Sequence, residues 1–352
     1  MTDESTPKRR KRVTIYDVAR EAGVAASTVS RAFARPGRVN AETGVRIHEA
    51  AARLGYRVDP ISRPEGITPG NKLLAFVVAD VTNPVYAHIM KGFQKEATAH
   101  GHTVLLIDSQ EDGQMENQLI HSVLHLVDGV ALTSSRLSDS AIAQIVKVTP
   151  VVAVNRAIAG LPSINPDTAR GLRRAVEHLA TLGHRRLTYL SGPAASWADG
   201  ARWRAVSEAC QELSLHLRRI GPNAPSIHGG FAAGREWQEH PTSGVIAYND
   251  IMAIGFMKQV QGAGYRVPDD VSVIGVDNSI SSVLTTPTLT TVSPATSLIG
   301  ARAARALITQ LRHRGAPSAE TIVTPMELLV RESVAPPPPT DPTPTSPHTE
   351  VR

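Results

Sequence analysis

The stretch VTIYDVAREAGVAASTVSRAF, residues 13–33, is typical of two short helices joined by a tight turn. Gly23 lies between the two helices, where the backbone most easily takes a positive φ. Val18, Val24 and Val29 have the spacing of apolar side chains that face inward from both helices. The stretch therefore predicts a helix-turn-helix, and nucleic-acid binding is the leading hypothesis.

Capping signals extend this motif to a unit of three helices. Thr14 is expected to cap the first helix, with Asp17 as its capping-box partner. The second helix is expected at about 26–34. A loop rich in helix breakers then leads to Asn40, a good N-cap for a third helix that ends at Leu54.

The positive charge of the chain is concentrated at the same end. Residues 1–64 hold 13 Lys and Arg against 7 Asp and Glu, a net charge of +6, whereas the remainder carries 24 against 25. Such asymmetry indicates a polyanionic partner for that end alone. The alternative, a basic surface that only aids solubility, would not predict this localisation.

Length and composition limit the class of protein. The 352 residues suffice for two or three domains, and 41% of them are hydrophobic, without a run long enough to span a membrane. The polar, basic arm at 1–12 does not resemble a secretory signal. A single cysteine, Cys210, excludes an internal disulfide framework and favours a cytoplasmic location.

From residue 73 the chain alternates between apolar strands and helices. Strands are expected at 73–79, 103–108, 129–133, 150–155, 186–191, 244–248 and 271–276, and helices at 84–100, 167–182, 198–213 and 250–262. Continuous apolar strands separated by helices predict an α/β fold with parallel sheets covered on both faces. Two such runs indicate two similar lobes with a cleft between them. Ligands of such folds bind at the carboxyl ends of the strands.

These signals predict five segments in chain order. They are a basic disordered arm at 1–12, a helix-turn-helix domain at 13–57, a hinge or linker at 58–72, a two-lobed core at 73–332 and a disordered tail at 333–352. The linker is rich in Pro and Gly, and the Pro- and Thr-rich composition of the tail cannot build a packed core.

Specific motifs resemble the LacI/GalR (lactose-repressor) family of bacterial transcription regulators. They are VTIYDVAREAGVAASTVSR (13–31), RLGYRVDP (53–60), TNPVY (82–86), VDGV (127–130), VEHLATLGHRRLTYLSGP (176–193), AYND (247–250), VPDDVSVIGVDN (267–278) and LTTV (289–292). The resemblance spans about residues 13–332. It implies a DNA-binding headpiece, a hinge and a two-lobed effector-binding core like that of periplasmic sugar-binding proteins, usually as a dimer.

The resemblance also implies roles for residues of the headpiece. It assigns base reading to Ala26, Ser27 and Arg31, and Arg31 has the geometry to pair bidentately with guanine. Phosphate contacts are implied for Thr14, Tyr16, Thr28, Ser30 and Asn40. Two alternatives stay open: Arg31 as a phosphate clamp, and Ser30 bonding within its own helix.

Two departures from the family pattern concern DNA binding. Ala25 stands where relatives usually have Ser at the start of the recognition helix, which removes an N-cap. In the linker, Pro64 obstructs the short helix that relatives commonly form, and Glu65 falls near the position of an apolar minor-groove wedge. A carboxylate cannot replace that wedge, so we expect weaker bending of the operator than in typical relatives.

For the core, the resemblance implies an effector between the lobes. The candidate residues are Asn83, Tyr86, Asp108, Arg156, Trp197, Arg202, Asn249 and Asp277. Arg202 aligns with an arginine that commonly grips the ligand, and Asp277 with an aspartate that accepts from its hydroxyl groups. Such a set suits a sugar. Three alternatives stay open: Arg202 pairs with a carboxylate, Trp197 packs between the lobes, and Asp277 caps a helix. Gly229 and Pro294 occupy positions that contact the ligand in some relatives, so the identity of the ligand cannot be taken over from those relatives.

Other classes of function have weaker support. No phosphate-binding glycine motif follows a strand, and Cys210 fits buried packing better than a nucleophile, so no enzymatic activity and no cofactor are expected. His121 and His125 share a helical face without a third ligand, so no metal site is expected, and His178 and His184 fit structural roles. A transport-type sugar-binding protein and a regulator without an effector are the remaining rivals.

We therefore expect a cytoplasmic, homodimeric, DNA-binding repressor without a membrane segment. Its partners are expected to be a double-stranded operator, as an imperfect palindrome, and a small-molecule effector, most simply a sugar.

Overall fold

The computed structural model describes residues 14–34, 39–54, 71–312 and 320–339. The chain divides into two compact units, residues 1–69 and 70–352. The predicted arm at 1–12 and residues 58–70 of the predicted linker, including Pro64 and Glu65, lie outside the described residues. The expectation of weak operator bending therefore stays a prediction.

The first unit contains the three expected helices. They are α1 (Ile15–Ala22), α2 (Ala26–Ala34) and α3 (Ala41–Leu54). Thr14 and Asp17 form the expected capping box at α1. Val18, Val29 and Ile47, one from each helix, are fully buried and form the centre of a small core.

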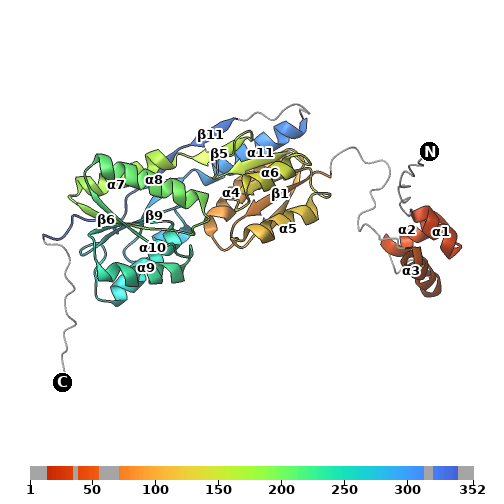
Figure 1. The fold of residues 1–352 in the computed structure, drawn as a ribbon, viewed down its shortest axis with the longest axis horizontal. Coiled ribbons are helices and arrows are strands. Elements are labelled where there is room, and N and C mark those ends of the chain that lie inside the picture. Colours follow the sequence, from red (N-terminus) through yellow and green to blue (C-terminus); the bar gives the residue numbers. More distant parts are fainter. Residues whose placement is uncertain (1–13, 35–38, 55–70, 313–319, 340–352) are drawn as a thin grey trace, which may run out of the picture. The chain divides into compact units, whose positions relative to one another are not determined.

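The second unit contains two lobes, each built on a six-stranded sheet (Figure 1). In lobe 1 every strand pair is parallel, in the order β11-β5-β4-β3-β1-β2. These strands are β1 (Leu73–Val78), β2 (Thr103–Asp108), β3 (Gly129–Thr133), β4 (Val151–Val154), β5 (Ser163–Pro166) and β11 (Thr321–Thr324). One face packs on α4 (Pro84–Ala99) and α11 (Thr296–Arg312), and the other on α5 (Gly113–Val123) and α6 (Asp139–Val146).

Lobe 2 repeats this arrangement with one reversed strand. Its order is β12-β10-β9-β8-β6-β7, and only the β10–β12 pair is antiparallel. The strands are β6 (Arg186–Leu190), β7 (His216–Ile220), β8 (Gly244–Ala247), β9 (Ser272–Val276), β10 (Thr290–Pro294) and β12 (Met326–Leu329). Helices α7 (Thr168–Thr181) and α8 (Trp197–Glu212) cover one face, and α9 (Ile227–Glu239) and α10 (Asp250–Gly262) the other. A short 3-10 helix, η2 (Ile280–Val283), follows β9.

The strands and helices that the alternation predicts are all present, with bounds that differ by at most one residue. The connections between the lobes were not anticipated. The chain crosses three times, between β5 and α7, between β10 and α11, and between β11 and β12. Because of the second and third crossings, α11 and β11 belong to lobe 1 although they follow most of lobe 2 in the sequence.

Helices α4 and α11 approach each other closely because glycines lie at their contact. A Cβ atom on Gly300 of α11 would overlap the carbonyl oxygen of Ile89 in α4. A Cβ atom on Gly92 of α4 would likewise overlap the carbonyl oxygen of Ser297 in α11. The two helices can therefore pack backbone to backbone only with glycine at both positions.

The start of the predicted tail at residue 333 is wrong. Ser333 is fully buried, and its hydroxyl accepts from the Thr290 amide at 2.8 Å and donates to the Val273 carbonyl at 2.6 Å. The Ala335 amide donates to the hydroxyl of Ser272 at 3.0 Å. These bonds tie the segment to β9 and β10, so the core extends beyond 332. Residues 340–352 of the predicted tail lie outside the described residues.

Candidate functional site

The helix-turn-helix presents a polar face on α2. Gly23 has φ +64°, the left-handed conformation that the turn requires, and its amide donates to the carbonyl of Arg20. Ser27, Ser30 and Arg31 are exposed on α2, opposite the buried Val29. This arrangement leaves the polar side chains of α2 free to contact a duplex.

Arg31 has a defined position on that face. Its Nε donates to the carbonyl oxygen of Ser27 at 3.2 Å, and one terminal nitrogen lies 3.5 Å from the Ser27 hydroxyl. Among the described residues Arg31 has no carboxylate partner, so its charge is available to an incoming ligand. Ala26 and Thr28 are half-buried on the same helix.

The remaining predicted DNA-contact residues lie at the helix ends. The Asp17 carboxylate accepts from the Thr14 amide at 2.8 Å in the capping box of α1, and the Asn40 side chain accepts from the Glu42 amide at 3.1 Å at the start of α3. Tyr16 on α1 is 65% exposed. Ala25 occupies the N-cap position of α2, where its carbonyl accepts from the Thr28 and Val29 amides but its methyl side chain accepts nothing.

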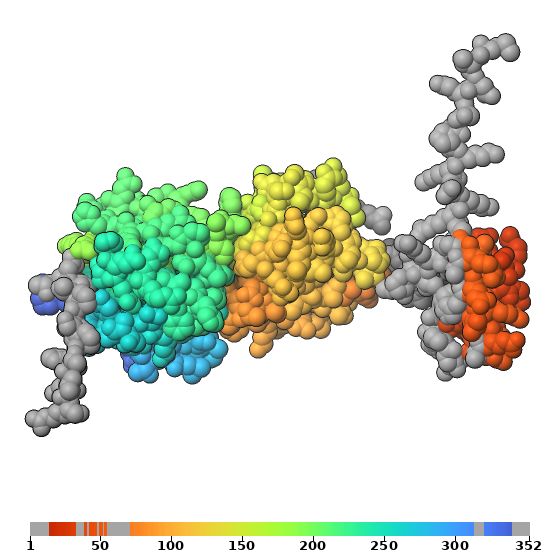
Figure 2. All heavy atoms as spheres, turned by 60° about the horizontal axis from the view of Figure 1, so that its bottom comes forward, coloured from red at the N-terminus to blue at the C-terminus, as the bar shows by residue number. Residues whose placement is uncertain are grey.

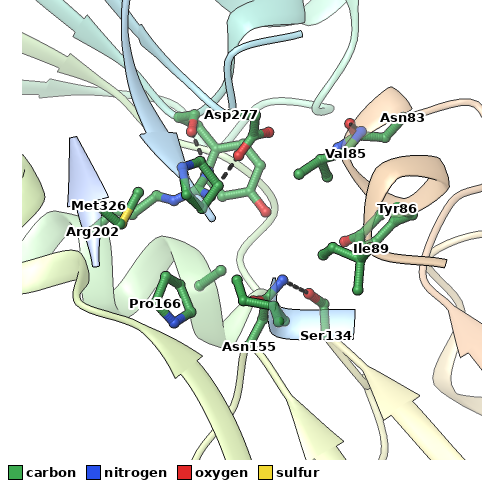
Figure 3. A pocket seen from close by; sticks show the side chains of 14 residues that line it. Asn83, Val85, Tyr86, Ile89, Ser134, Asn155, Pro166, Arg202, Asp277 and Met326 are labelled. Atoms are coloured by element: carbon green, nitrogen blue, oxygen red, sulfur yellow. Dashed lines mark hydrogen bonds and ion pairs between the residues drawn. The ribbon is translucent and has the colours of Figure 1, made fainter. Parts of the chain in front are cut away.

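A polar pocket lies between the two lobes (Figure 3). We call it the inner pocket; it has a volume of about 20 Å³. Its lining is Asn83, Val85, Tyr86, Ile89, Ser134, Asn155, Pro166, Ala198, Arg202, Tyr248, Asp277, Pro294, Ile299 and Met326. Asn83 and Tyr86 approach from the lobe 1 side, whereas Arg202 and Asp277 approach from the lobe 2 side.

Arg202 and Asp277 form a buried ion pair in this pocket. A terminal nitrogen of Arg202 donates to Asp277 Oδ1 at 3.1 Å, and the other donates to the carbonyl oxygen of Tyr248. The guanidinium also lies over the Tyr248 ring, 4.7 Å from its centroid. Burial raises the pKa of Asp277 to about 6, although Arg202 opposes the shift. Arg202 therefore pairs with a carboxylate and also lines the pocket, so these two possible roles do not exclude each other.

Asp250 lies behind this pair at the start of α10. Its carboxylate accepts from the Ser279 amide at 2.7 Å and from the Thr291 hydroxyl at 2.6 Å. Burial, and secondly the charge of Asp277, raise the pKa of Asp250 to about 7. A buried acid that sequence analysis did not select thus links the segment after β9 to the start of β10.

A second cavity, of about 340 Å³, adjoins the inner pocket. We call it the arginine pocket. Its lining is Ser135, Arg136, Leu137, Arg156, Ala194, Ala195, Ser196, Trp197, Gly200, Ala201 and Arg204. Arg156 of lobe 1 lies over the ring of Trp197 of lobe 2, 5.9 Å from its centroid, so the two lobes touch here. In Figure 2 the green and cyan surface of lobe 2 meets the yellow and orange surface of lobe 1 along a continuous seam.

The eight predicted effector residues separate into three groups. Asn83, Tyr86, Arg202 and Asp277 line the inner pocket, and Arg156 and Trp197 line the arginine pocket. Asp108 and Asn249 line neither of these two pockets. The Asp108 carboxylate accepts from the Val81 and Gln110 amides, and the Asn249 side chain caps α10 by accepting from Met252.

Several lining residues were missed. Asn155 and Tyr248 stand directly beside the predicted Arg156 and Asn249 in the sequence, and Arg204 follows Arg202 by two positions on α8. For Asn155 and Tyr248 the available signal was their position directly after β4 and β8, because ligands bind at the carboxyl ends of strands, whereas Arg204 inside α8 offered no such signal. Cys210 is buried, and burial raises the pKa of its thiol to about 11, which fits packing.

No helix within the described residues is long and apolar enough to cross a bilayer.

Comparisons with known proteins agree with this architecture. Residues 14–59 match the model of bacterial regulatory proteins of the lacI family, and residues 176–334 match that of periplasmic binding protein-like domains. The HTH-type transcriptional repressor PurR of Mannheimia succiniciproducens is 30% identical over 336 residues, which cover 91% of this chain and 98% of that protein. The repressor CytR of Escherichia coli (strain K12) is 28% identical over 334 residues, 93% of this chain and 97% of its own length.

The solved structures extend the likeness to the fold. The complex of the transcriptional regulator CelR with cellobiose has a TM-score of 0.67 and 27% identity, covering 92% of this chain and all of that chain. Both the helix-turn-helix and the two-lobed core are thus shared with regulators, and the similarity to repressors runs almost from end to end. The chain belongs to the LacI family of bacterial regulatory proteins, which are DNA-binding transcription regulators and not enzymes.

Proposed function

We propose that this chain is a cytoplasmic, homodimeric repressor of an imperfectly palindromic operator, and that a sugar-type molecule bound between the lobes changes its operator affinity. The observation that carries the proposal is the inner pocket, where polar side chains from both lobes converge in a chain that also carries a helix-turn-helix. A ligand that touches both lobes stabilises one lobe arrangement over others.

The DNA-contact assignment rests on exposure and charge. Arg31 and Ser27 are exposed on the outer face of α2 and read bases together with Ala26. The phosphate contacts come from Thr14, Tyr16, Thr28, Ser30 and Asn40, which lie on α2 or at the ends of α1 and α3. In a homodimer each headpiece reads one half-site, so the operator has two-fold symmetry.

The effector assignment rests on the balance of donors and acceptors in the inner pocket. Asp277 accepts, Arg202 donates, and Asn83 and Asn155 do both. A sugar hydroxyl is likewise both donor and acceptor, so a polyol satisfies this set better than an apolar or purely cationic ligand does. The CelR relative is solved with cellobiose, which has this chemistry. Asp108, which accepts from two loop amides, and Asn249, which caps α10, are not part of the proposed contact set.

Ligand entry requires the lobes to separate. A volume of about 20 Å³ holds roughly one water molecule, far less than a sugar needs. The lobes open to admit the ligand and close on it, and the closed arrangement has a different affinity for the operator. Reciprocity requires that a ligand which weakens operator binding is itself bound less tightly by the operator complex, by the same factor.

The test begins with purified full-length protein and selection of duplexes from a random library. We expect enrichment of an imperfect palindrome. Mono- and disaccharides are then screened by thermal shift, because a ligand that binds the folded state raises its melting temperature. A hit is titrated with and without the selected operator. The Arg202→Gln variant should keep operator binding and lose the response to the hit.

The rival hypotheses give different results. A regulator without an effector binds the operator but responds to no sugar in either assay. A transport-type binding protein responds to a sugar but selects no duplex. Either result contradicts the proposed function.

A further inference from the structure

The arginine pocket differs in chemistry from the inner pocket beside it. Its lining includes three guanidinium groups, from Arg136 and Arg156 of lobe 1 and Arg204 of lobe 2, and two hydroxyls. It includes no Asp, Glu, Asn or Gln, whereas the inner pocket includes Asp277 and two asparagines. The side chains of the walls therefore donate hydrogen bonds, and only the two hydroxyls among them can accept.

The two hydroxyls, of Ser135 and Ser196, already take part in hydrogen bonds and can accept few more from a ligand. The Ser135 hydroxyl accepts from the Leu137 amide at 3.1 Å, and the Ser196 hydroxyl accepts from the Asp199 amide at 3.2 Å and bonds the Tyr248 hydroxyl at 3.1 Å. A neutral sugar placed here would find few acceptors for its own hydroxyl protons. A group with several acceptor oxygens and no proton to donate fits far better.

The three arginines differ in how many of their side-chain nitrogens are already hydrogen-bonded. Arg136 uses all its side-chain nitrogens on Glu111 and the Ser134 carbonyl, and its side chain is 2% exposed. Arg156 donates to the Ser135 and Leu137 carbonyls and to Asp139, and its Nε has no hydrogen bond to any described residue. Arg204 is exposed and has neither a hydrogen bond nor an ion pair with any described residue. Arg204 is therefore the cation that is free to meet a ligand.

Nearby carboxylates do not cancel this charge. Glu111 and Asp139 lie outside the lining, and the Asp139 side chain is 79% exposed, so water screens it. Asp199 of α8 is buried and bound by Arg219. Glu116, behind Ser135, is buried, and burial raises its pKa, which favours its neutral form. Glu208, one turn beyond Arg204 on α8, is exposed and forms no ion pair with it, so among the described residues the charge of Arg204 stays unpaired.

The two pockets are neighbours along the chain as well as in space. Ser134 lines the inner pocket and Ser135 the arginine pocket, and the same division separates Asn155 from Arg156. A single ligand can therefore reach both. A carbon skeleton would contact Trp197 and Leu137 on the way.

We infer that the effector carries an anionic group, a phosphate ester or a carboxylate, which binds in the arginine pocket while its hydroxyls occupy the inner pocket. The inference rests on the proposed function and narrows its ligand to an acidic sugar derivative. Arg204 and Arg156, from opposite lobes, contact the same anion, so the charge itself holds the lobes closed. A volume of about 340 Å³ accommodates such a group together with part of its carbon skeleton.

The experiment uses the full-length protein without DNA, so that it does not depend on operator binding. Inorganic phosphate, glycerol phosphate and glycerate are titrated at constant ionic strength, with glycerol as the neutral control. Binding is followed by calorimetry and by quenching of tryptophan fluorescence, to which Trp197 contributes. The variants are Arg204→Gln and Arg204→Glu. The matched control is Arg174→Glu, an exposed arginine on α7 of the same lobe.

We expect saturable binding of the anions and none of glycerol. Arg204→Gln should weaken it by about tenfold, Arg204→Glu should abolish it, and Arg174→Glu should leave it unchanged. Tighter binding of glycerol phosphate than of glycerate assigns a phosphate ester, and the reverse order a carboxylate. Absence of saturable anion binding to the unmodified protein, or equal binding by the Arg204 variants, overturns the inference. A neutral sugar that binds and shifts operator affinity would then leave the proposed function intact.

Discussion

Arg31 lies on the outer face of α2 with its guanidinium turned back toward Ser27 of the same helix. To read a base it must exchange these intrahelical contacts for base-edge acceptors, which provide stronger bidentate geometry. We predict that Arg31→Ala lowers the affinity for the selected operator by about 1–3 kcal/mol and lowers nonspecific affinity much less. Footprinting at low salt on operator and on scrambled duplex measures both.

The control for this prediction is Arg53→Ala on α3. Its ion pair with Glu21 is exposed and contributes little to stability. It should preserve the preference for the operator. Equal losses on both duplexes in Arg31→Ala would identify Arg31 as a phosphate clamp, and no loss on either would remove it from the interface.

Asp250 gives a second prediction, on pH. Its pKa in the folded protein, about 7, lies above its ordinary value, so the folded state binds the proton more tightly than the unfolded chain does. The resulting stability is fully present below about pH 4 and is lost as the pH rises through about 7. Asp250→Asn should therefore lower the free energy of unfolding by about 2 kcal/mol more at about pH 5 than at about pH 7.5.

Urea denaturation at the two pH values measures this difference. The control is Asp270→Asn, because the hydrogen bond from Arg266 holds the pKa of that carboxyl below its usual value. Asp270 is ionised in both states throughout this window, so its substitution should cost the same at both pH values. A cost of Asp250→Asn that does not change with pH would contradict the raised pKa.

At the scale of elements, the contact between α4 and α11 depends on glycine. A Cβ at Gly300 would meet the backbone of Ile89, which cannot move without displacing the helix. Gly300→Ala should destabilise the core by about 1–3 kcal/mol, as overpacking does. Gly262→Ala at the end of α10 is the matched control, since no described residue lies within 4 Å of its Cβ position and a helical alanine is favoured there. Calorimetric melting of both variants tests the contrast; equal melting temperatures would refute it.

The elements show what sequence can and cannot specify. β1, β3 and β8 are continuous apolar runs buried on both faces, and their period and length define them locally. β11 and β12 are short and partly exposed, and their identity depends on the partner strands β5 and β10, far away in sequence. The segment after 332 has the composition of a tail, but Ser333 finds donors and acceptors that only the folded sheet provides.

The same limit applies to the site. Arg202 and Asp277 came from the family resemblance, and the structure places them together in the inner pocket. Asn249 follows a strand and precedes a helix, a position that serves a cap as well as a ligand contact, and here its side chain caps α10. Arg204 has no local signal, because only the packing of α8 decides that it borders a cavity.

At the scale of the whole core, ligand binding should change the separation of the lobes. Cys210 is buried, so spin labels can be directed to introduced cysteines at Ser122 on α5 and Gln211 on α8, in opposite lobes. We expect a broad distribution of long distances without ligand and a narrow, shorter one with the ligand found by screening. Pulsed electron paramagnetic resonance measures the two distance distributions.

Labels at Thr181 and Gln211, both exposed in lobe 2, provide the control and should give the same distance in both states. If the distances between lobes were also unchanged, the pocket would have to admit its ligand without separation of the lobes, which contradicts the proposed opening.

The threefold passage of the chain between the lobes has a consequence for dissection of the molecule. Neither lobe corresponds to one continuous piece of gene, so neither can be cloned alone by choosing a start and a stop codon. A protease that cuts one of the three connections leaves the other two intact, so the two lobes stay covalently joined under native conditions.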